Sequence, residues 1–165
     1  MRLLPAVEAY AETIAAWPAS GHEVTMWCGR REYPLPPRVV AEWLREQDVR
    51  AYALLDGRDL LGYGELWFDA EEDEVELARV IVAPGFRGRG VGRALVRNLT
   101  GLALDAGQAN IFMRVHPDNQ AALRCYRHAG FHPVDDDLAA AWNAAQPVAY
   151  VWLRHAAPAD HPSPG

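Results

Sequence analysis

A glycine-rich turn between an apolar stretch and an amphipathic stretch is the feature that most restricts this chain. Residues 75–97 read VELARVIVAPGFRGRGVGRALVR. This pattern predicts a strand, a short turn and the first turns of a helix. The first N–H groups of a helix have no intrahelical partner and carry partial positive charge. The turn therefore predicts an anion site, for which phosphate is the natural guest.

The residues of the turn favour a phosphate ligand. Its three glycines permit a positive φ and a close approach of the backbone to a bulky ligand. The expected amide donors belong to Gly88, Gly90, Val91 and Gly92. The arginines that add positive charge around them are Arg87, Arg89 and Arg93.

Two widespread phosphate-binding motifs do not fit this turn. The Walker motif needs Lys and Ser or Thr after its last glycine, where this chain has Arg93 and Ala94. The dinucleotide motif G-x-G-x-x-G places its third glycine one residue later than Gly92. What remains is R-x-x-G-x-G over residues 87–92, after a strand that ends in Val-Ala-Pro. This pattern resembles the acetyl-CoA loop of the GNAT-type N-acetyltransferases.

A second segment carries the same resemblance. An apolar, strand-like stretch at residues 109–115 precedes a segment similar to the family's N-x-x-A-x-x-x-Y-x-x-x-G-F. Its matching residues are Asn119, Ala122, Tyr126, Gly130 and Phe131. The resemblance implies a single-domain α/β (α+β) fold. We expect a mixed, mostly antiparallel sheet of about seven strands, flanked by about four helices, in which two parallel strands splay apart.

Hydrophobic periodicity and turn residues give an alternating order of elements. The predicted strands are residues 3–4, 51–55, 60–68, 75–82, 109–115, 131–134 and 147–153. The predicted helices are residues 5–17, 37–47, 90–106 and 119–129. Asp56-Gly57 is typical of the turn of a hairpin. We expect one domain over residues 1–155 and a loose tail over residues 156–165, which hold three prolines.

The resemblance also implies roles for single residues. The backbone of Val80, Ile81 and Val82 would pair with pantetheine, and the amides of residues 87–92 would hold the pyrophosphate. Asn119 would hydrogen-bond the cofactor arm. Tyr126 would lie near the thioester sulfur and protonate the departing thiolate, as a group with a pKa of about 10 can do. A packed aromatic ring at Tyr126 and a helix cap at Asn119 are the structural alternatives.

For the general base, Glu76 is the first choice and Glu65 the second. Glu76 lies six residues before Val82. Strict alternation along the strand would place it on the same face as Ala78, Val80 and Val82. Some GNAT enzymes carry a glutamate at the matching place, and it would act through water. A carboxylate that is merely solvated is the alternative.

The acceptor stays open at this stage beyond being an amine on a small molecule or a protein. The aromatic side chains that either line its pocket or pack in the core are Trp27, Tyr33, Trp43 and Trp67. The acidic run at residues 69–74 either attracts a cationic amine or is a solvated turn. Two other functions also stay open: a non-catalytic acetyl-CoA-binding sensor, and an acyltransferase for a longer acyl group.

Composition agrees with a cytoplasmic enzyme. The chain has 165 residues, half of them apolar, with no apolar run long enough to span a membrane and no signal-peptide pattern. Its net charge of −6 disfavours general nucleic-acid binding. Two cysteines do not make a disulfide framework. No His and Cys spacing matches a metal site, so we expect no metal. A homodimer through the C-terminal edge strand is one arrangement that the resemblance allows.

Overall fold

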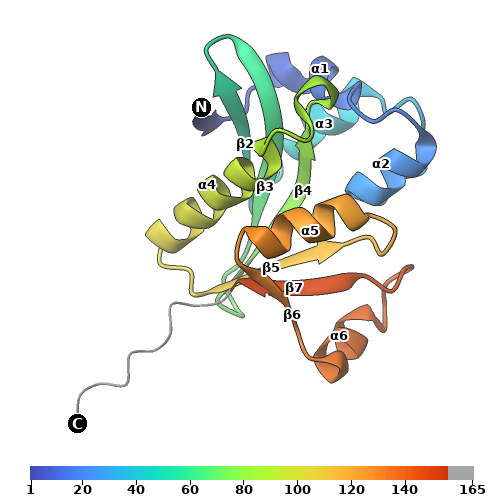
Figure 1. Cartoon of the computed structure of the whole chain (residues 1–165), viewed down its shortest axis with the longest axis vertical. Helices are drawn as coiled ribbons and strands as arrows, with labels where there is room; N and C mark the ends of the chain where they lie inside the picture. The colour runs from blue at the N-terminus through green and yellow to red at the C-terminus, as the bar shows by residue number, and fades with distance from the viewer. Residues whose placement is uncertain (156–165) are drawn as a thin grey trace.

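Seven strands form one mixed sheet. The computed structural model describes residues 1–155, and the predicted tail lies outside them. Figure 1 shows the sheet, whose strand order is β1-β2-β3-β4-β5-β7-β6. The strands are β1 (Arg2–Pro5), β2 (Val49–Asp56), β3 (Asp59–Asp69), β4 (Glu74–Val82), β5 (Asn110–Val115), β6 (Phe131–Pro133) and β7 (Val151–His155). Only β4 and β5 pair in parallel among these strands. The predicted fold class is confirmed.

Six α-helices cover the sheet in the described part of the chain. They are α1 (Ala11–Ala15), α2 (Gly21–Cys28), α3 (Pro37–Trp43), α4 (Val91–Asp105), α5 (Gln120–His128) and α6 (Asp136–Asn143). Two 3₁₀ turns, η1 (Glu8–Tyr10) and η2 (Pro84–Phe86), precede α1 and α4. The four predicted helices correspond to α1, α3, α4 and α5, although the first is much shorter than expected.

The sequence analysis did not predict α2 and α6, and side-chain caps start both of them. Ser20 Oγ accepts the Glu23 N–H at 3.1 Å, and Asp135 Oδ1 accepts the Leu138 N–H at 2.8 Å. Pro18 and Gly21 flank the start of α2, and both residue types are typical of turns. The Ser-x-x-Glu pattern from Ser20 to Glu23 is nevertheless a capping signature that indicates a helix start.

The sheet separates two hydrophobic cores. Helices α4 and α5 pack on one face, and α1, α2 and α3 pack on the other (Figure 1). The fully buried side chains of the first core include Leu77, Leu95, Leu99 and Phe131. Tyr63, Ile81 and Ala83 supply the sheet side of the second core. Strand β4 therefore contributes to both cores.

A β-bulge at Arg79 allows β4 to do so. Glu65 pairs with Ala78, but Tyr63 pairs with Ile81, so one residue of β3 faces two residues of β4. Arg79 takes the left-handed conformation with φ 49°. An inserted residue reverses the alternation of the strand from that point on. Val80 and Val82 consequently face α4, while Ile81 faces the N-terminal helices.

The parallel pairing of β4 with β5 ends shortly before this bulge. Its last partners are Leu77 and Met113. Beyond them the two strands diverge, as expected from the resemblance. Their inner edges then carry backbone N–H and C=O groups that no neighbouring strand binds, and buried groups of this kind need partners. The divergence creates a wedge at the carboxyl ends of the two strands.

A tight contact between β3 and α4 gives the first testable prediction. A Cβ atom added at Gly64 would lie 2.7 Å from Leu99 Cδ1, and Leu99 is fully buried. We expect Gly64→Ala to lower the free energy of unfolding by about 1–3 kcal/mol, as overpacking does. Gly101, inside α4 with open space around its Cβ position, is the control. Gly101→Ala should raise the stability by about 0.5–1 kcal/mol. Urea unfolding measures both, and equal values would contradict the packing argument.

Candidate functional site

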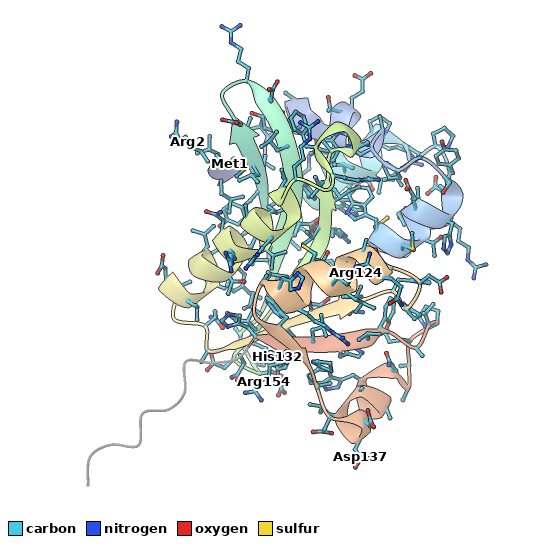
Figure 2. All side chains as sticks on the ribbon, viewed as in Figure 1. Met1, Arg2, Arg124, His132, Asp137 and Arg154 are labelled. Atoms are coloured by element: carbon cyan, nitrogen blue, oxygen red, sulfur yellow. The ribbon has the colours of Figure 1, made fainter. Side chains whose placement is uncertain are left out.

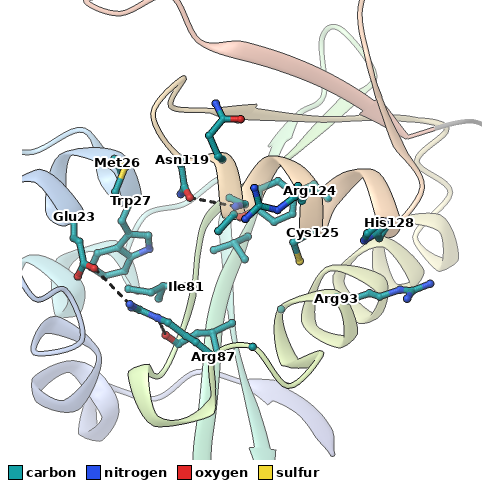
Figure 3. A pocket seen from close by; sticks show the side chains of 18 of the residues that line it. Glu23, Met26, Trp27, Ile81, Arg87, Arg93, Asn119, Arg124, Cys125 and His128 are labelled. Atoms are coloured by element: carbon teal, nitrogen blue, oxygen red, sulfur yellow. Dashed lines mark hydrogen bonds and ion pairs between the residues drawn. The ribbon is translucent and has the colours of Figure 1, made fainter.

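A cavity of about 810 Å³ lies between the carboxyl end of β4 and α5. Figure 3 shows its walls, which come from the end of β4, the glycine turn, α2 and α5. The predicted site residues that line it are Val80, Ile81, Val82, Arg87, Gly88, Gly90, Gly92, Asn119 and Tyr126. The structure thus brings residues from distant parts of the sequence into one space.

The glycine turn leaves open space above its backbone. Gly88 and Gly90 have φ values of 76° and 79°, and a Cβ atom at either would meet no atom within 4 Å. Gly90 is the N-cap of α4, where no side chain caps the helix. Gly92 is small for another reason, because its Cβ would lie 3.1 Å from Cys125 Sγ. The first two glycines keep the helix N-terminus accessible, and Gly92 lets α4 pack against α5.

Basic side chains line the same cavity as the glycine turn. Arg93 lines the cavity from α4, and Arg124 and His128 line it from α5. Figure 2 shows Arg124 on the side of α5 that faces α2 and α4. Arg89 is not among the lining residues, and its guanidinium carbon lies 5.9 Å from the centre of the Phe86 ring. The Val91 side chain is buried in the core, so only its backbone belongs to the turn.

Asn119 is the N-cap of α5, and Tyr126 lies on the helix seven residues later, about two turns away. Tyr126 is only 8% exposed, and this burial, with a smaller effect of Cys125, raises its pKa above the ordinary value. The hydroxyl therefore stays protonated at neutral pH and is a proton donor. Asn119 Oδ1 accepts the Ala122 N–H at 3.2 Å and caps the helix. Its amide N–H groups are the donors left for a ligand.

Glu76 lies away from the predicted face. Because of the bulge at Arg79, it shares a face with Ala78 but not with Val80 and Val82, so the alternation argument was wrong for these two residues. Its two oxygens accept Nε and Nη2 of Arg114, each at 2.8 Å. Burial would lower the pKa of Arg114, but the hydrogen bonds and charge of Glu76 outweigh it and raise that pKa. Glu76 lines a second cavity of about 370 Å³, on the side of the sheet that α6 covers.

Glu65 is fully buried beside the bulge. Its carboxylate accepts hydrogen bonds from Tyr63 Oη at 2.9 Å, Trp67 Nε1 at 3.0 Å and Arg79 Nη1 at 2.9 Å. Burial raises the pKa of Glu65, while Arg79 and the other two donors act in the opposite direction. Glu65 does not line the larger cavity. This network holds the bulge in place.

The four aromatic residues that the sequence assigned either to the acceptor pocket or to the core lie in different places. Trp43 is buried in the core, and Tyr33 is exposed. Trp67 lines the second cavity. Trp27 lines the larger cavity, and its Nε1 donates to the Arg79 carbonyl at 2.8 Å. Helix α2 is thereby attached to the bulge of β4.

Sequence reasoning missed the contribution of α2 to the larger cavity. Glu23 and Met26 line it beside Trp27. The spacing of three between Glu23 and Met26 places both on one side of a helix, but α2 itself was not predicted. Within residues 1–155, no group of three or more His, Cys, Asp or Glu side chains is arranged to hold a metal ion. No helix in the same part of the chain is long and apolar enough to cross a membrane.

Comparison with known sequences finds a family and several relatives. The model of the acetyltransferase (GNAT) family matches residues 9–131. Streptothricin acetyltransferase of Streptomyces lavendulae is 33% identical over 88 residues, which are 52% of this chain and 46% of that protein. The N-alpha-acetyltransferase RimI of Mycobacterium tuberculosis is 40% identical over 104 residues, which are 61% of this chain and 63% of RimI. The chain therefore matches about half the length of these relatives.

Comparison with solved structures shows the same fold over nearly the whole chain. The aminoglycoside acetyltransferase AAC(6')-Ib, solved with coenzyme A and kanamycin, superposes with a TM-score of 0.69 at 19% identity. The match covers 93% of this chain and 92% of that one. At this identity, the likeness concerns the fold.

Proposed function

We propose, because the chain belongs to the acetyltransferase (GNAT) family, that it transfers an acetyl group from acetyl-CoA to a primary amine. The observation that carries the proposal is the single cavity in which the diverging strand edge, the glycine turn and Tyr126 meet. An uncapped helix start, the inner edge of a diverging strand and a buried hydroxyl suit the binding of the cofactor and the protonation of its leaving sulfur.

The residues of the cavity fit acetyl-CoA. The open space at Gly88 and Gly90 and the uncapped start of α4 suit the pyrophosphate, with Arg87 and Arg93 beside them. The backbone groups on the inner edge of residues 80–82 suit the amides of pantetheine, and the Val82 carbonyl meanwhile accepts the Nε–H of Arg87. Asn119 can donate to the same arm. Bound acetyl-CoA supplies an acetyl group activated as a thioester.

The chain has to align the amine and manage protons. We propose direct attack by the amine in a ternary complex, with the wedge backbone orienting the thioester carbonyl. Tyr126 donates its proton to the departing sulfur. Burial raises the pKa of Tyr126, so the hydroxyl carries this proton at neutral pH.

For the base we retain Glu76, acting through water. Its two oxygens accept two parallel N–H groups of Arg114, which fix the position of the carboxylate. The carboxylate lies on the face of the sheet opposite α4 and α5, where β4 also presents Ala78. Glu65 is the weaker candidate because it is fully buried.

A thiol-release assay with a panel of amines tests the proposed function. The panel holds streptothricin, kanamycin, spermidine and a peptide with a free N-terminus, and a thermal shift with acetyl-CoA precedes it. A shift with turnover of one class supports the enzyme and identifies its acceptor. A shift without turnover of any amine favours the cofactor-binding module, and turnover only with a longer acyl-CoA favours the other acyltransferase. Absence of a shift contradicts the cofactor site.

Substitution of Gly90 tests the pyrophosphate site. Gly90→Glu places bulk and negative charge in the open space above the turn, so we expect acetyl-CoA binding to be lost in calorimetry. Gly57→Glu in the hairpin between β2 and β3 is the matched control. Gly57 also has a positive φ and open space, and it does not line the cavity. Unchanged affinity in the Gly90 variant would rule out the assignment of the turn.

Removal of the Tyr126 hydroxyl tests its role as acid. We expect Tyr126→Phe to lower kcat by roughly 10- to 1000-fold while the affinity for acetyl-CoA is nearly kept, because only a proton donor is lost. Tyr52→Phe on β2 is the control, since Tyr52 does not line the cavity. Steady-state kinetics and calorimetry measure the two quantities. A Phe variant with full kcat would exclude Tyr126 from the chemistry.

The pH dependence of kcat/KM tests Glu76. In Glu76→Gln we expect the alkaline rise of kcat/KM to move upward, toward the pKa of the free amine, because the amine must then lose its proton to solvent. Glu71→Gln, in the exposed turn after β3, is the charge-matched control. A profile identical to that of the wild type would point to Glu65 or to solvent as the base.

A further inference from the structure

The side chain of Arg87 crosses the larger cavity and connects its two walls. Its Nε donates to the Val82 carbonyl at 3.1 Å. Its Nη1 lies 3.6 Å from Glu23 Oε1 on α2. Figure 3 shows both interactions as dashed lines, with Arg87 between the end of β4 and α2. One guanidinium thus occupies a backbone group of the wedge and a carboxylate of the opposite wall.

The bound cofactor would compete for both interactions of Arg87. The Val82 carbonyl is one of the wedge groups proposed to pair with pantetheine. The pyrophosphate offers the guanidinium more negative charge than one carboxylate, and it lies beside the amides of the same turn. The Arg87–Glu23 pair is long, and its side chains are 41% and 33% exposed, so it contributes little. Arg87 therefore exchanges Glu23 for the pyrophosphate.

Glu23 stays in place after this exchange. Its other oxygen, Oε2, accepts the Ala19 N–H, and its own N–H donates to Ser20 Oγ at the start of α2. The carboxylate keeps its position in the wall of the cavity beside Met26 and Trp27. Oε1 then faces the cavity without its cation. A fixed carboxylate of this kind binds an ammonium group well.

We propose that Glu23 binds a second ammonium group of the acceptor, and that the pyrophosphate frees Glu23 for this role by taking Arg87. This inference rests on the proposed function and adds a substrate class, amines with at least one further positive charge. The ammonium bound by Glu23 is not the attacking group, because the attacking amine must be neutral. Cofactor binding and acceptor binding are coupled through Arg87, so each strengthens the other.

Calorimetry with hexamethylenediamine and hexylamine tests the proposal without turnover, with CoA in place of acetyl-CoA. Saturation with CoA should tighten diamine binding by about five- to 150-fold, the usual range of coupling between two sites. Hexylamine has one ammonium group, which can occupy Glu23 or the position of the attacking amine but not both, so it should bind more weakly than the diamine in the presence of CoA. In Glu23→Gln the effect of CoA on the diamine should vanish, while CoA itself binds as tightly as before or tighter, because Arg87 has lost its other partner. The glutamine oxygen can still accept the Ala19 N–H, so α2 keeps its cap.

Glu12→Gln on α1 is the matched control, since Glu12 is exposed and does not line the cavity. It should behave as the wild type, and thermal unfolding checks that both variants fold. In the thiol-release assay, the preference of kcat/KM for the diamine over hexylamine should fall by about tenfold or more in Glu23→Gln, as expected for loss of a charged hydrogen bond.

Three results would overturn the role of Glu23: no diamine binding in the presence of CoA, an effect of CoA that persists in Glu23→Gln, or an equal loss in Glu12→Gln. If amines are acetylated while any of these holds, the proposed function stands and this inference fails. If no amine is acetylated but CoA tightens diamine binding only with Glu23 present, the binding role stands and the proposed transfer fails.

Discussion

The bulge at Arg79 is the constraint on which the rest of the site depends. One extra residue reverses the alternation of β4. The core under α4 therefore receives odd-numbered residues before the bulge, such as Leu77, and even-numbered residues after it, such as Val80. Pairing with β5 ends at Leu77. The wedge exists because the two parallel strands diverge beyond this residue, and the divergence leaves backbone groups without a partner strand. Arg79 is held at two points. Glu65 accepts a hydrogen bond from its side chain, and the indole N–H of Trp27 donates to its carbonyl.

Charge divides the cavity into two ends. The end near the glycine turn combines the helix N-terminus with Arg93 and Arg124. The α2 wall contributes Glu23, and Arg87 connects the two regions. These surfaces are complementary to an anionic cofactor and to the cationic acceptor that we propose. Arg87 lies between them and can neutralise only one partner at a time, which is the basis of the proposed coupling.

The two motifs predicted most of the site because they describe local backbone chemistry. A glycine turn before a helix leaves backbone N–H groups accessible, and Asn119 and Tyr126 keep a fixed spacing along one helix and its cap. Glu76 shows where such reasoning stops. Its face depended on strict alternation through residue 79, and nothing in the residue type of Arg79 indicates a left-handed conformation. The capping pattern at Ser20 was readable, but the nearby Pro18 and Gly21 favoured a turn.

By itself, the sequence determined the family, the order of the strands along the chain and the donors of the glycine turn, because periodicity and turn chemistry are local properties. Only the tertiary structure decided that α2 forms a wall of the cavity, that Arg114 binds Glu76, and that Arg87 lies between Val82 and Glu23. Apart from the hydrogen bond between Arg87 and Val82, these contacts join residues far apart in the sequence. They follow from how the bulged strand and the helices pack, which no short window of the sequence shows.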